Sequence, residues 1–253
     1  AFLNAKRTCR VDIQYEHTLV RPGGRCAEDA VAGSVLATDG VPYLVRIPRF
    51  AHYRSMDRVI EYSLPNLENI RRCGRYGDYV GKCVYIAPLL YAVDRSVLDG
   101  TRTRDVITTF NNEKEPRRKA FLERARAAGV AITNETGRFD RESLRVLYGD
   151  SRILVNIRQT PHHHTFEELR VLPALLCGCL VISEDVPLRE LIPYERSVIW
   201  VDMESIIDVI QDVQSHYREY RERTFTEEFF ESVQRMREHN ERVAAEIVAG
   251  RFA

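Results

Sequence analysis

The stretch that decides the fold is Ile153-Leu-Val-Asn-Ile-Arg-Gln-Thr-Pro-His-His-His-Thr-Phe-Glu-Glu-Leu-Arg-Val-Leu-Pro-Ala-Leu-Leu-Cys-Gly-Cys-Leu-Val-Ile-Ser-Glu184. It predicts a buried strand over 153–157, a helix from about Thr165 to Gly178, and a second buried strand over 179–182. Short apolar runs without alternation are typical of parallel strands that helices cover on both faces. A strand–helix–strand unit of this kind binds ligands beyond the carboxyl ends of its strands, so we expect a site there.

Composition narrows the functional classes. The 253 residues carry 37 Lys plus Arg and 37 Asp plus Glu, and a net charge of zero argues against a nucleic-acid binder. No apolar run is long enough to span a membrane. Six cysteines without a CxxC pair favour a reducing compartment, the cytoplasm, or the host cytoplasm if the protein is viral. We expect Cys177 and Cys179 to be small core residues. The chain begins at Ala1 rather than Met, so we expect either one domain of a larger multidomain chain or a processed product.

The first part of the chain reads as a small α/β region. We expect one strand over 11–20, a turn from Arg21, and a second β segment over 33–47 whose Asp-Gly pair at 39–40 is typical of a hairpin. A strand over 58–63, a helix with Leu67 and Ile70 on one face, and a strand over 82–88 complete a βαβ unit.

A second α/β region follows the linker predicted over 88–103. Its expected strands are 105–110, 130–133, the two central strands and 197–201. Helices are expected after Pro116, over 141–148, near Leu188 and from about 204, and a charged helical tail begins at Tyr217. The fold class is therefore α/β, with two Rossmann-like lobes facing a cleft. The expected domains are 1–95, 96–215 and a helical tail over 216–253.

Residues 105–202 resemble the C-terminal donor lobe of GT-B glycosyltransferases. The likeness rests on the strand and Arg-bearing helix over 105–129, on Asp150-Ser-Arg-Ile-Leu-Val-Asn-Ile157, and on the E-x-R-x-x-x-A-x-x-x-G pattern that starts at Glu168. The lobe is most similar to those of spore-maturation-protein-B-like transferases and related bacterial and large-virus enzymes. Many GT-B enzymes carry two glutamates eight positions apart. Thr165 and Pro173 stand at the aligned positions here, so Glu167 or Glu168 would have to replace the ribose contact.

The resemblance implies an enzyme that transfers a sugar from a nucleoside-diphosphate sugar, with a UDP- or GDP-sugar as the expected donor and a glycan or other hydroxyl group as acceptor. It implies no metal and no tightly bound cofactor, because basic side chains and a helix N-terminus stabilise the diphosphate. The alternative is a non-catalytic nucleotide- or sugar-binding domain of a larger glycan-assembly protein. The candidate donor-binding residues are Asn112, Lys114, Arg117, Arg118, Asn156, His162, His163, His164, Thr165, Glu167, Glu168, Arg170, Ser183 and Glu184.

Several of these residues have a structural alternative. Arg118, the first choice for the diphosphate, could belong to a solvated helix start. The three consecutive histidines could lie in a solvated loop, and they point in different directions, which disfavours a metal site. Thr165 and Glu168 fit a capping box, which would explain Glu168 structurally and leave Glu167 for the crevice. Asn156 interrupts a buried strand and should have a definite partner.

The acceptor side is expected in the first lobe. Glu16 and His17 follow the first strand, and one of them is the candidate catalytic base; both could equally be ordinary residues at the end of a strand. The candidate acceptor-binding residues are Arg21, Gly23, Gly24, Tyr62 and Asn66. Arg21 and the two glycines could simply form the turn, and for Asn66 the favoured role is to cap the following helix.

Overall fold

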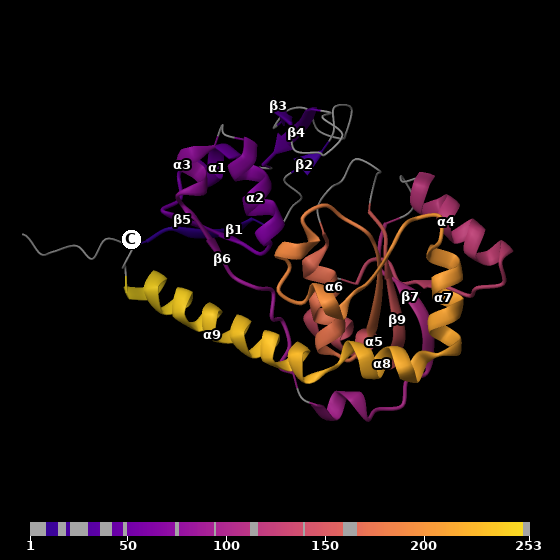
Figure 1. The fold of residues 1–253 in the computed structure, drawn as a ribbon. Helices are drawn as coiled ribbons and strands as arrows, with labels where there is room; N and C mark the ends of the chain where they lie inside the picture. The colour runs from indigo at the N-terminus through magenta and orange to yellow at the C-terminus, as the bar shows by residue number, and fades with distance from the viewer. Residues whose placement is uncertain are drawn as a thin grey trace, which may run out of the picture. The chain divides into compact units, whose positions relative to one another are not determined.

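The computed structural model describes residues 9–14, 19–20, 30–35, 42–47, 50–73, 76–93, 95–111, 116–138, 140–158 and 166–249. The chain forms two compact units (Figure 1). Unit 1 contains residues 1–87 and 238–253, and unit 2 contains residues 88–237. Each unit contains a parallel β-sheet with helices, so the α/β class with Rossmann-like sheets is confirmed.

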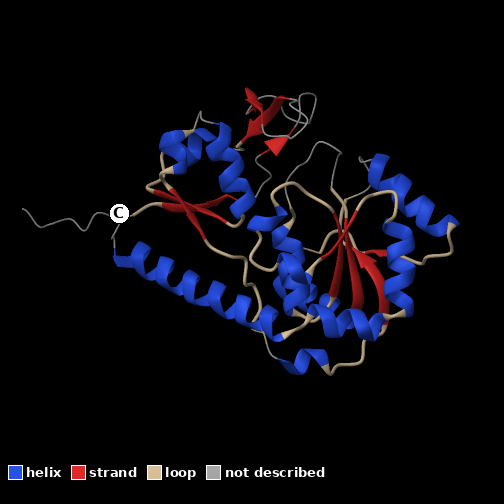
Figure 2. Cartoon of the chain, viewed as in Figure 1, coloured by secondary structure: helices blue, strands red, loops and turns tan. Residues whose placement is uncertain are grey.

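Unit 2 is built on a five-stranded sheet in which every pair is parallel. Helices cover both faces of this sheet, with α4 and α7 on one side and α5 and α6 on the other (Figures 1 and 2). The strands are β7 (Arg104–Thr108), β8 (Thr133–Asn134), β9 (Ser151–Asn156), β10 (Leu180–Glu184) and β11 (Ile199–Val201). The helices are α4 (Pro116–Ala127), α5 (Arg141–Asp150), α6 (Glu168–Leu176), α7 (Ile206–Ser215) and α8 (Tyr217–Thr224).

The strand order of this sheet, β11-β10-β9-β7-β8, fixes where a ligand is expected. The chain runs outward from β7 to β8 in one direction and from β9 to β11 in the other. The order therefore reverses between β7 and β9. At such a reversal the connections leave the two strands toward opposite faces and open a crevice at their carboxyl ends.

The central unit β9–α6–β10 has the predicted form. All five residues of β10 are buried, and β9 pairs with it in parallel from Ile153 and Leu180 onward. Helix α6 ends because Gly178 adopts a left-handed φ of 72°, which glycine tolerates best. Cys177 and Cys179 are buried free thiols, as expected for small core residues.

Among its described residues, unit 1 contains two sheets. Strands β1 (Val11–Gln14), β5 (Arg58–Glu61) and β6 (Cys83–Tyr85) form a parallel sheet, and β2 (Leu19–Val20), β4 (Pro42–Arg46) and β3 (Ala30–Val35) form an antiparallel one. The expected β3–β4 hairpin pairing and the parallel β5–β6 pair are confirmed. The helices are α1 (Phe50–Arg54), α2 (Leu64–Cys73) and α3 (Gly77–Val80).

Three local predictions were wrong. The single strand over 11–20 is two strands, because β1 pairs with β5 whereas β2 pairs with β4, and tertiary pairing overrides local preference. Strand β8 starts only at Thr133. The segment after Leu188 is a short 3₁₀ turn, η3 (Arg189–Leu191), because Leu188 itself adopts a left-handed φ of 62°, which no α-helix accommodates.

The C-terminal part is helical, as predicted, and its last helix, α9 (Glu227–Ala249), belongs to both units. Asn240 forms two hydrogen bonds with the backbone of Ala87, accepting from the N–H at 2.9 Å and donating to the carbonyl at 2.8 Å. His239 Nε2 lies 3.0 Å from the carbonyl oxygen of Tyr85. These contacts tie the middle of α9 to the end of β6 and to the segment that follows it. Within the described ranges no helix is both long enough and apolar enough to cross a bilayer.

The side chain of Arg102 links several backbone segments at the amino-terminal side of the unit 2 sheet. Its guanidinium donates hydrogen bonds of 2.9–3.0 Å to five backbone carbonyls, which belong to the 3₁₀ helix η2 (Arg95–Leu98), the end of α5, the start of β9 and the residue after α6. The accepting residues are Val97, Tyr148, Gly149, Ser151 and Cys177.

We expect Gly178→Ala to lower the free energy of unfolding by about 2–4 kcal/mol, since the new methyl group would combine a left-handed backbone with overpacking. Its Cβ would lie 2.5 Å from Arg102 Nη2 and 3.2 Å from the carbonyl oxygen of Val97. Urea denaturation measures the change. Gly149→Ala is the matched control, because among the described residues no atom beyond its chain neighbours and its own helix backbone lies within 4 Å of the added Cβ. Equal stabilities of the two variants would contradict the packing of Arg102 against Gly178.

Candidate functional site

Arg118 spans the point where the strand order reverses. From the first turns of α4, its Nη2 donates to the carbonyl oxygen of Ile157, beyond β9, at 2.8 Å. Its Nη1 donates to the carbonyl oxygen of Asn111, beyond β7, at 3.4 Å. The guanidinium carbon lies 4.8 Å from the ring centroid of Phe110, and the side chain is buried. In this conformation Arg118 directs its donors at protein carbonyls and joins the two segments that border the crevice.

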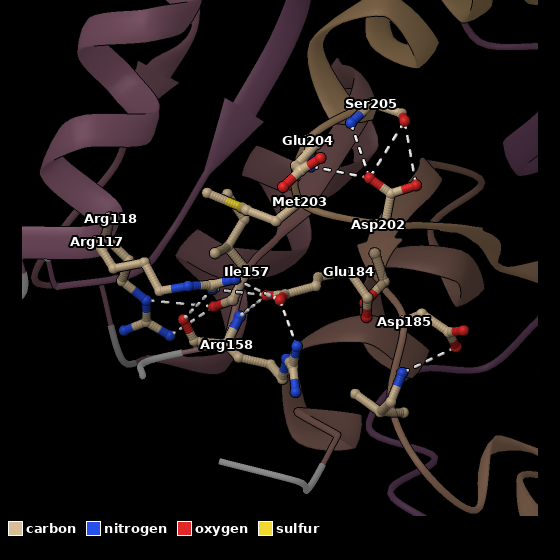
Figure 3. A network of polar contacts seen from close by, with 12 residues as sticks. Arg117, Arg118, Ile157, Arg158, Glu184, Asp185, Asp202, Met203, Glu204 and Ser205 are labelled. Atoms are coloured by element: carbon tan, nitrogen blue, oxygen red, sulfur yellow. Dashed lines mark hydrogen bonds and ion pairs between the residues drawn. The ribbon is translucent and has the colours of Figure 1, made fainter. Parts of the chain in front are cut away.

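Two neighbouring arginines converge on Glu184, the last residue of β10 (Figure 3). Arg117 binds both carboxylate oxygens, with an Nη1–Oε2 distance of 2.7 Å. Arg158 donates from its backbone N–H at 3.1 Å and from Nη2 at 2.6 Å. Glu184 is 2% exposed, whereas each arginine side chain is 18% exposed. The carboxylate therefore holds two guanidinium groups that still reach solvent.

The charge of Glu184 is maintained by its partners. Burial opposes the ionised form, but the hydrogen bonds from Arg117 and Arg158 outweigh it and hold the pKa of this carboxyl below its usual value. Glu184 therefore stays ionised at neutral pH and fixes the orientation of both arginines.

A second polar chain lies at the end of β9. Arg170 Nη1 donates to Asn156 Oδ1 at 2.8 Å, and Asn156 Nδ2 donates to Ser183 Oγ at 3.0 Å. Arg170 Nη2 lies 3.9 Å from a carboxylate oxygen of Glu167. The expectation that Asn156 has a definite partner is confirmed. Its amide uses both ends, one to hold Arg170 and one to bind the neighbouring strand.

The two clusters lie on opposite faces of the sheet. Asn156 and Ser183 are register partners, and Glu184 follows Ser183 directly, so its side chain points to the other face. Arg170 approaches from α6, and Arg117 from α4 across the sheet. The three incompletely buried arginines, 117, 158 and 170, outnumber the glutamates 184 and 167 that contact them. The excess positive charge lies on the Glu184 side, where two arginines contact one carboxylate, whereas Arg170 is balanced by Glu167. The Glu184 side of the crevice is therefore suited to an anion.

The start of α6 differs from the predicted capping box. The helix begins at Glu168, and Glu167 occupies the N-cap position without a side-chain hydrogen bond to the helix. Glu168 is fully buried and accepts a hydrogen bond of 3.0 Å from the hydroxyl of Tyr194. A tertiary contact rather than a local cap explains this glutamate.

Arg158 is not among the predicted site residues, although it directly follows the strand predicted over 153–157. A charged residue immediately after a buried strand, at the end where ligands bind, was the available signal. Trp200 is also absent from the predicted residues. Its ring lies 4.8 Å from that of Phe166, just before α6.

Other predicted residues fall elsewhere. In unit 1, Tyr62 and Asn66 are buried. The helix-cap prediction for Asn66 was wrong, because Asn66 lies inside α2 and its backbone N–H donates to the hydroxyl of Ser63 at 3.4 Å, which makes Ser63 the capping residue. The predicted residues that lie outside the described ranges are Glu16, His17, Arg21, Gly23, Gly24, Asn112, Lys114, His162, His163, His164 and Thr165.

In the part of the chain that the structure describes, no group of three His, Cys, Asp or Glu side chains is placed to hold a metal ion. No protein-family model matches this sequence, and no curated protein matches it. A function for this protein is therefore inferred from the geometry of the site and from the sequence resemblance.

We expect Glu184→Gln to lower the free energy of unfolding at pH 7 by about 2–3 kcal/mol, since it leaves two arginines partly buried without their anion. Because the folded-state pKa of Glu184 is lowered, its contribution is complete above the unfolded pKa of about 4.3 and is lost as the pH falls through the folded value. Chemical denaturation across this acidic range should show a shallower loss for the variant than for the wild type.

Glu142→Gln is the control for this measurement, because Glu142 pairs with Arg145 on the exposed surface of α5 and should matter little. Identical pH profiles for wild type and Glu184→Gln would show that the Glu184 cluster does not contribute to the acid sensitivity of the fold.

Proposed function

We propose that this protein is a glycosyltransferase that transfers a sugar from a nucleoside-diphosphate sugar to a hydroxyl acceptor. The observation that carries the proposal is the placement of Arg117, Arg158 and Arg170 at the carboxyl edge of a parallel sheet, where its strand order reverses. The resemblance of residues 105–202 to GT-B donor lobes supports the same function.

The chemistry of the leaving group fits these side chains. When the bond between the sugar and the diphosphate breaks, its electron pair passes to a phosphate oxygen, and nearby cations stabilise the charge that develops there. Guanidinium groups match phosphate oxygens in geometry and remain charged at any physiological pH. Glu184 holds two of these groups and Asn156 holds the third before a ligand arrives, which lowers the cost of organising the site.

In this proposal unit 2 binds the donor and unit 1 binds the acceptor, as in the two lobes of GT-B enzymes. A parallel sheet in each unit supports the assignment, since each sheet has its own carboxyl edge at which a substrate can bind. A UDP- or GDP-sugar is the proposed donor.

A second candidate function is the binding of a nucleotide or sugar without catalysis. The observation that favours it is Pro173, which is buried inside α6 at the position aligned with the second glutamate of many GT-B enzymes. Without that glutamate the ribose contact must come from elsewhere, and Glu167, at the N-cap position of α6, is the proposed alternative.

Binding of nucleoside diphosphates tests the donor site. A matching diphosphate at about a hundred times its Kd should raise the Tm by roughly 5–10 °C in the presence of a chelator. Arg158→Ala and Arg170→Ala should each weaken binding by roughly tenfold to a hundredfold, the loss of one charge-assisted contact. Thermal shift against the diphosphates of uridine, guanosine, adenosine, cytidine and thymidine provides the measurement.

Arg145→Ala is the matched control, because Arg145 is an exposed arginine of α5 paired with Glu142. Nucleotide binding that is equally weak in all three variants would remove the site from the proposal, and the absence of a shift with every diphosphate would overturn it. Binding together with release of nucleoside diphosphate from a donor sugar supports the transferase, whereas binding without release over a broad panel of donors and acceptors supports the second candidate.

A further inference from the structure

Unit 1 has its own polar cluster at the carboxyl edge of its parallel sheet. Gln14 ends β1 and Glu61 ends β5, and the two residues are register partners. The chain then enters α2, whose first turns bring Asn66 and Asn69 to the same end. All four side chains are buried, with exposures of 0% for Gln14, Glu61 and Asn66 and 3% for Asn69. So many buried polar groups at one place require specific partners.

Part of this cluster is explained by the fold. Glu61 Oε1 accepts hydrogen bonds of 3.1 Å from the backbone N–H of Tyr62 and from Asn66 Nδ2. The carboxylate thus lies at the N-terminus of α2, where the helix dipole favours a negative charge. This contact orients the amide of Asn66 and turns its oxygen away from the carboxylate.

One polar side-chain atom of each asparagine has no role that the fold explains. Among the described residues, neither the buried Oδ1 of Asn66 nor the buried Nδ2 of Asn69 has a hydrogen-bond partner. The two residues are three positions apart on α2, so their side chains are neighbours on one helix face. This face of the helix therefore carries an acceptor, Asn66 Oδ1, and a donor, Asn69 Nδ2, and both atoms are uncharged. The group that satisfies both at once is one that donates and accepts, and a hydroxyl does so.

We propose that the Asn66–Asn69 face of α2, beside Glu61, binds a hydroxyl group of a neutral, sugar-like ligand. An anion without a proton, such as a carboxylate or a fully ionised phosphate monoester, could accept from Asn69 but could not donate to Asn66. The preference is therefore the reverse of that in unit 2, where arginines favour anions. This inference rests on the proposed function in one respect: if unit 2 transfers a sugar, the ligand of unit 1 is the acceptor, and its class is a neutral glycan.

The variant Asn69→Leu tests the site without removing the contact between Asn66 and Glu61. It replaces an amide whose donor has no partner by an apolar group of similar size, so the Tm should stay equal or rise. Ligand binding should fall by roughly tenfold, the loss of one hydrogen bond. The probes are methyl α-glucopyranoside, methyl α-mannopyranoside and methyl β-galactopyranoside, with glucose 6-phosphate as the charged comparison. Saturation-transfer NMR on the full chain measures their binding.

The control variant is Glu68→Gln on the same helix, whose carboxylate pairs with Arg71 and Arg72 at the surface. Binding of a neutral glycoside that is weakened by Asn69→Leu and unchanged by Glu68→Gln supports the site. No binding of any neutral glycoside to the wild type, or equal binding to wild type and Asn69→Leu, overturns it and leaves an internal water as the partner of the two amides.

Titration of nucleoside diphosphate into the same samples separates this inference from the proposed function. Glycoside binding without nucleotide binding would leave the unit 1 site standing while the transferase proposal fails. Nucleotide binding without glycoside binding would overturn the unit 1 site and leave the donor site of unit 2 untouched.

Discussion

The fold of unit 2 depends on the side chain of Arg102. It lies at the amino-terminal side of the central βαβ unit and satisfies carbonyls of the α5–β9 junction and of the residue that ends α6. The carbonyls of the last helical turn lack the intrahelical bonds of the helix interior, and burying a carbonyl unsatisfied would be costly. One guanidinium thereby fixes where β9 begins and where α6 ends. Gly178 leaves the space that this group occupies.

The carboxyl edge of the same strands uses arginines differently. Arg118 repeats the structural role of Arg102, because its donors go to the carbonyls beyond β7 and β9. Arg117, Arg158 and Arg170 are instead held by side chains, Glu184 and Asn156, that take only some of their donors. A guanidinium has five N–H groups, so an arginine held in this way remains able to bind a ligand. These two kinds of arginine differ in how many N–H groups their partners leave available.

The sequence predicted those parts of the structure that local patterns encode. The β9–α6–β10 unit, the end of α6 at Gly178, the start of α4 at Pro116 and the need of Asn156 for a partner all follow from periodicity, backbone preference or the cost of burial. The contacts of Arg118 and Glu168 could not be predicted from local patterns, because their partners, Ile157 and Tyr194, are 39 and 26 positions away. The separation of β1 from β2 depended equally on distant strands. Local patterns identify elements, whereas the roles of charged side chains are settled by tertiary partners.

Because helix α9 contributes residues to both units, the two units differ in when all their residues have been synthesised. Unit 2 is continuous in sequence and ends at residue 237, whereas unit 1 takes its last segment from residues 238–253. Asn240 and His239 then pair with the backbone of Ala87 and Tyr85, more than 150 positions earlier. During synthesis from the N-terminus, the second unit therefore has all its residues before the first does. The first unit to emerge from the ribosome is the last that can complete its contacts.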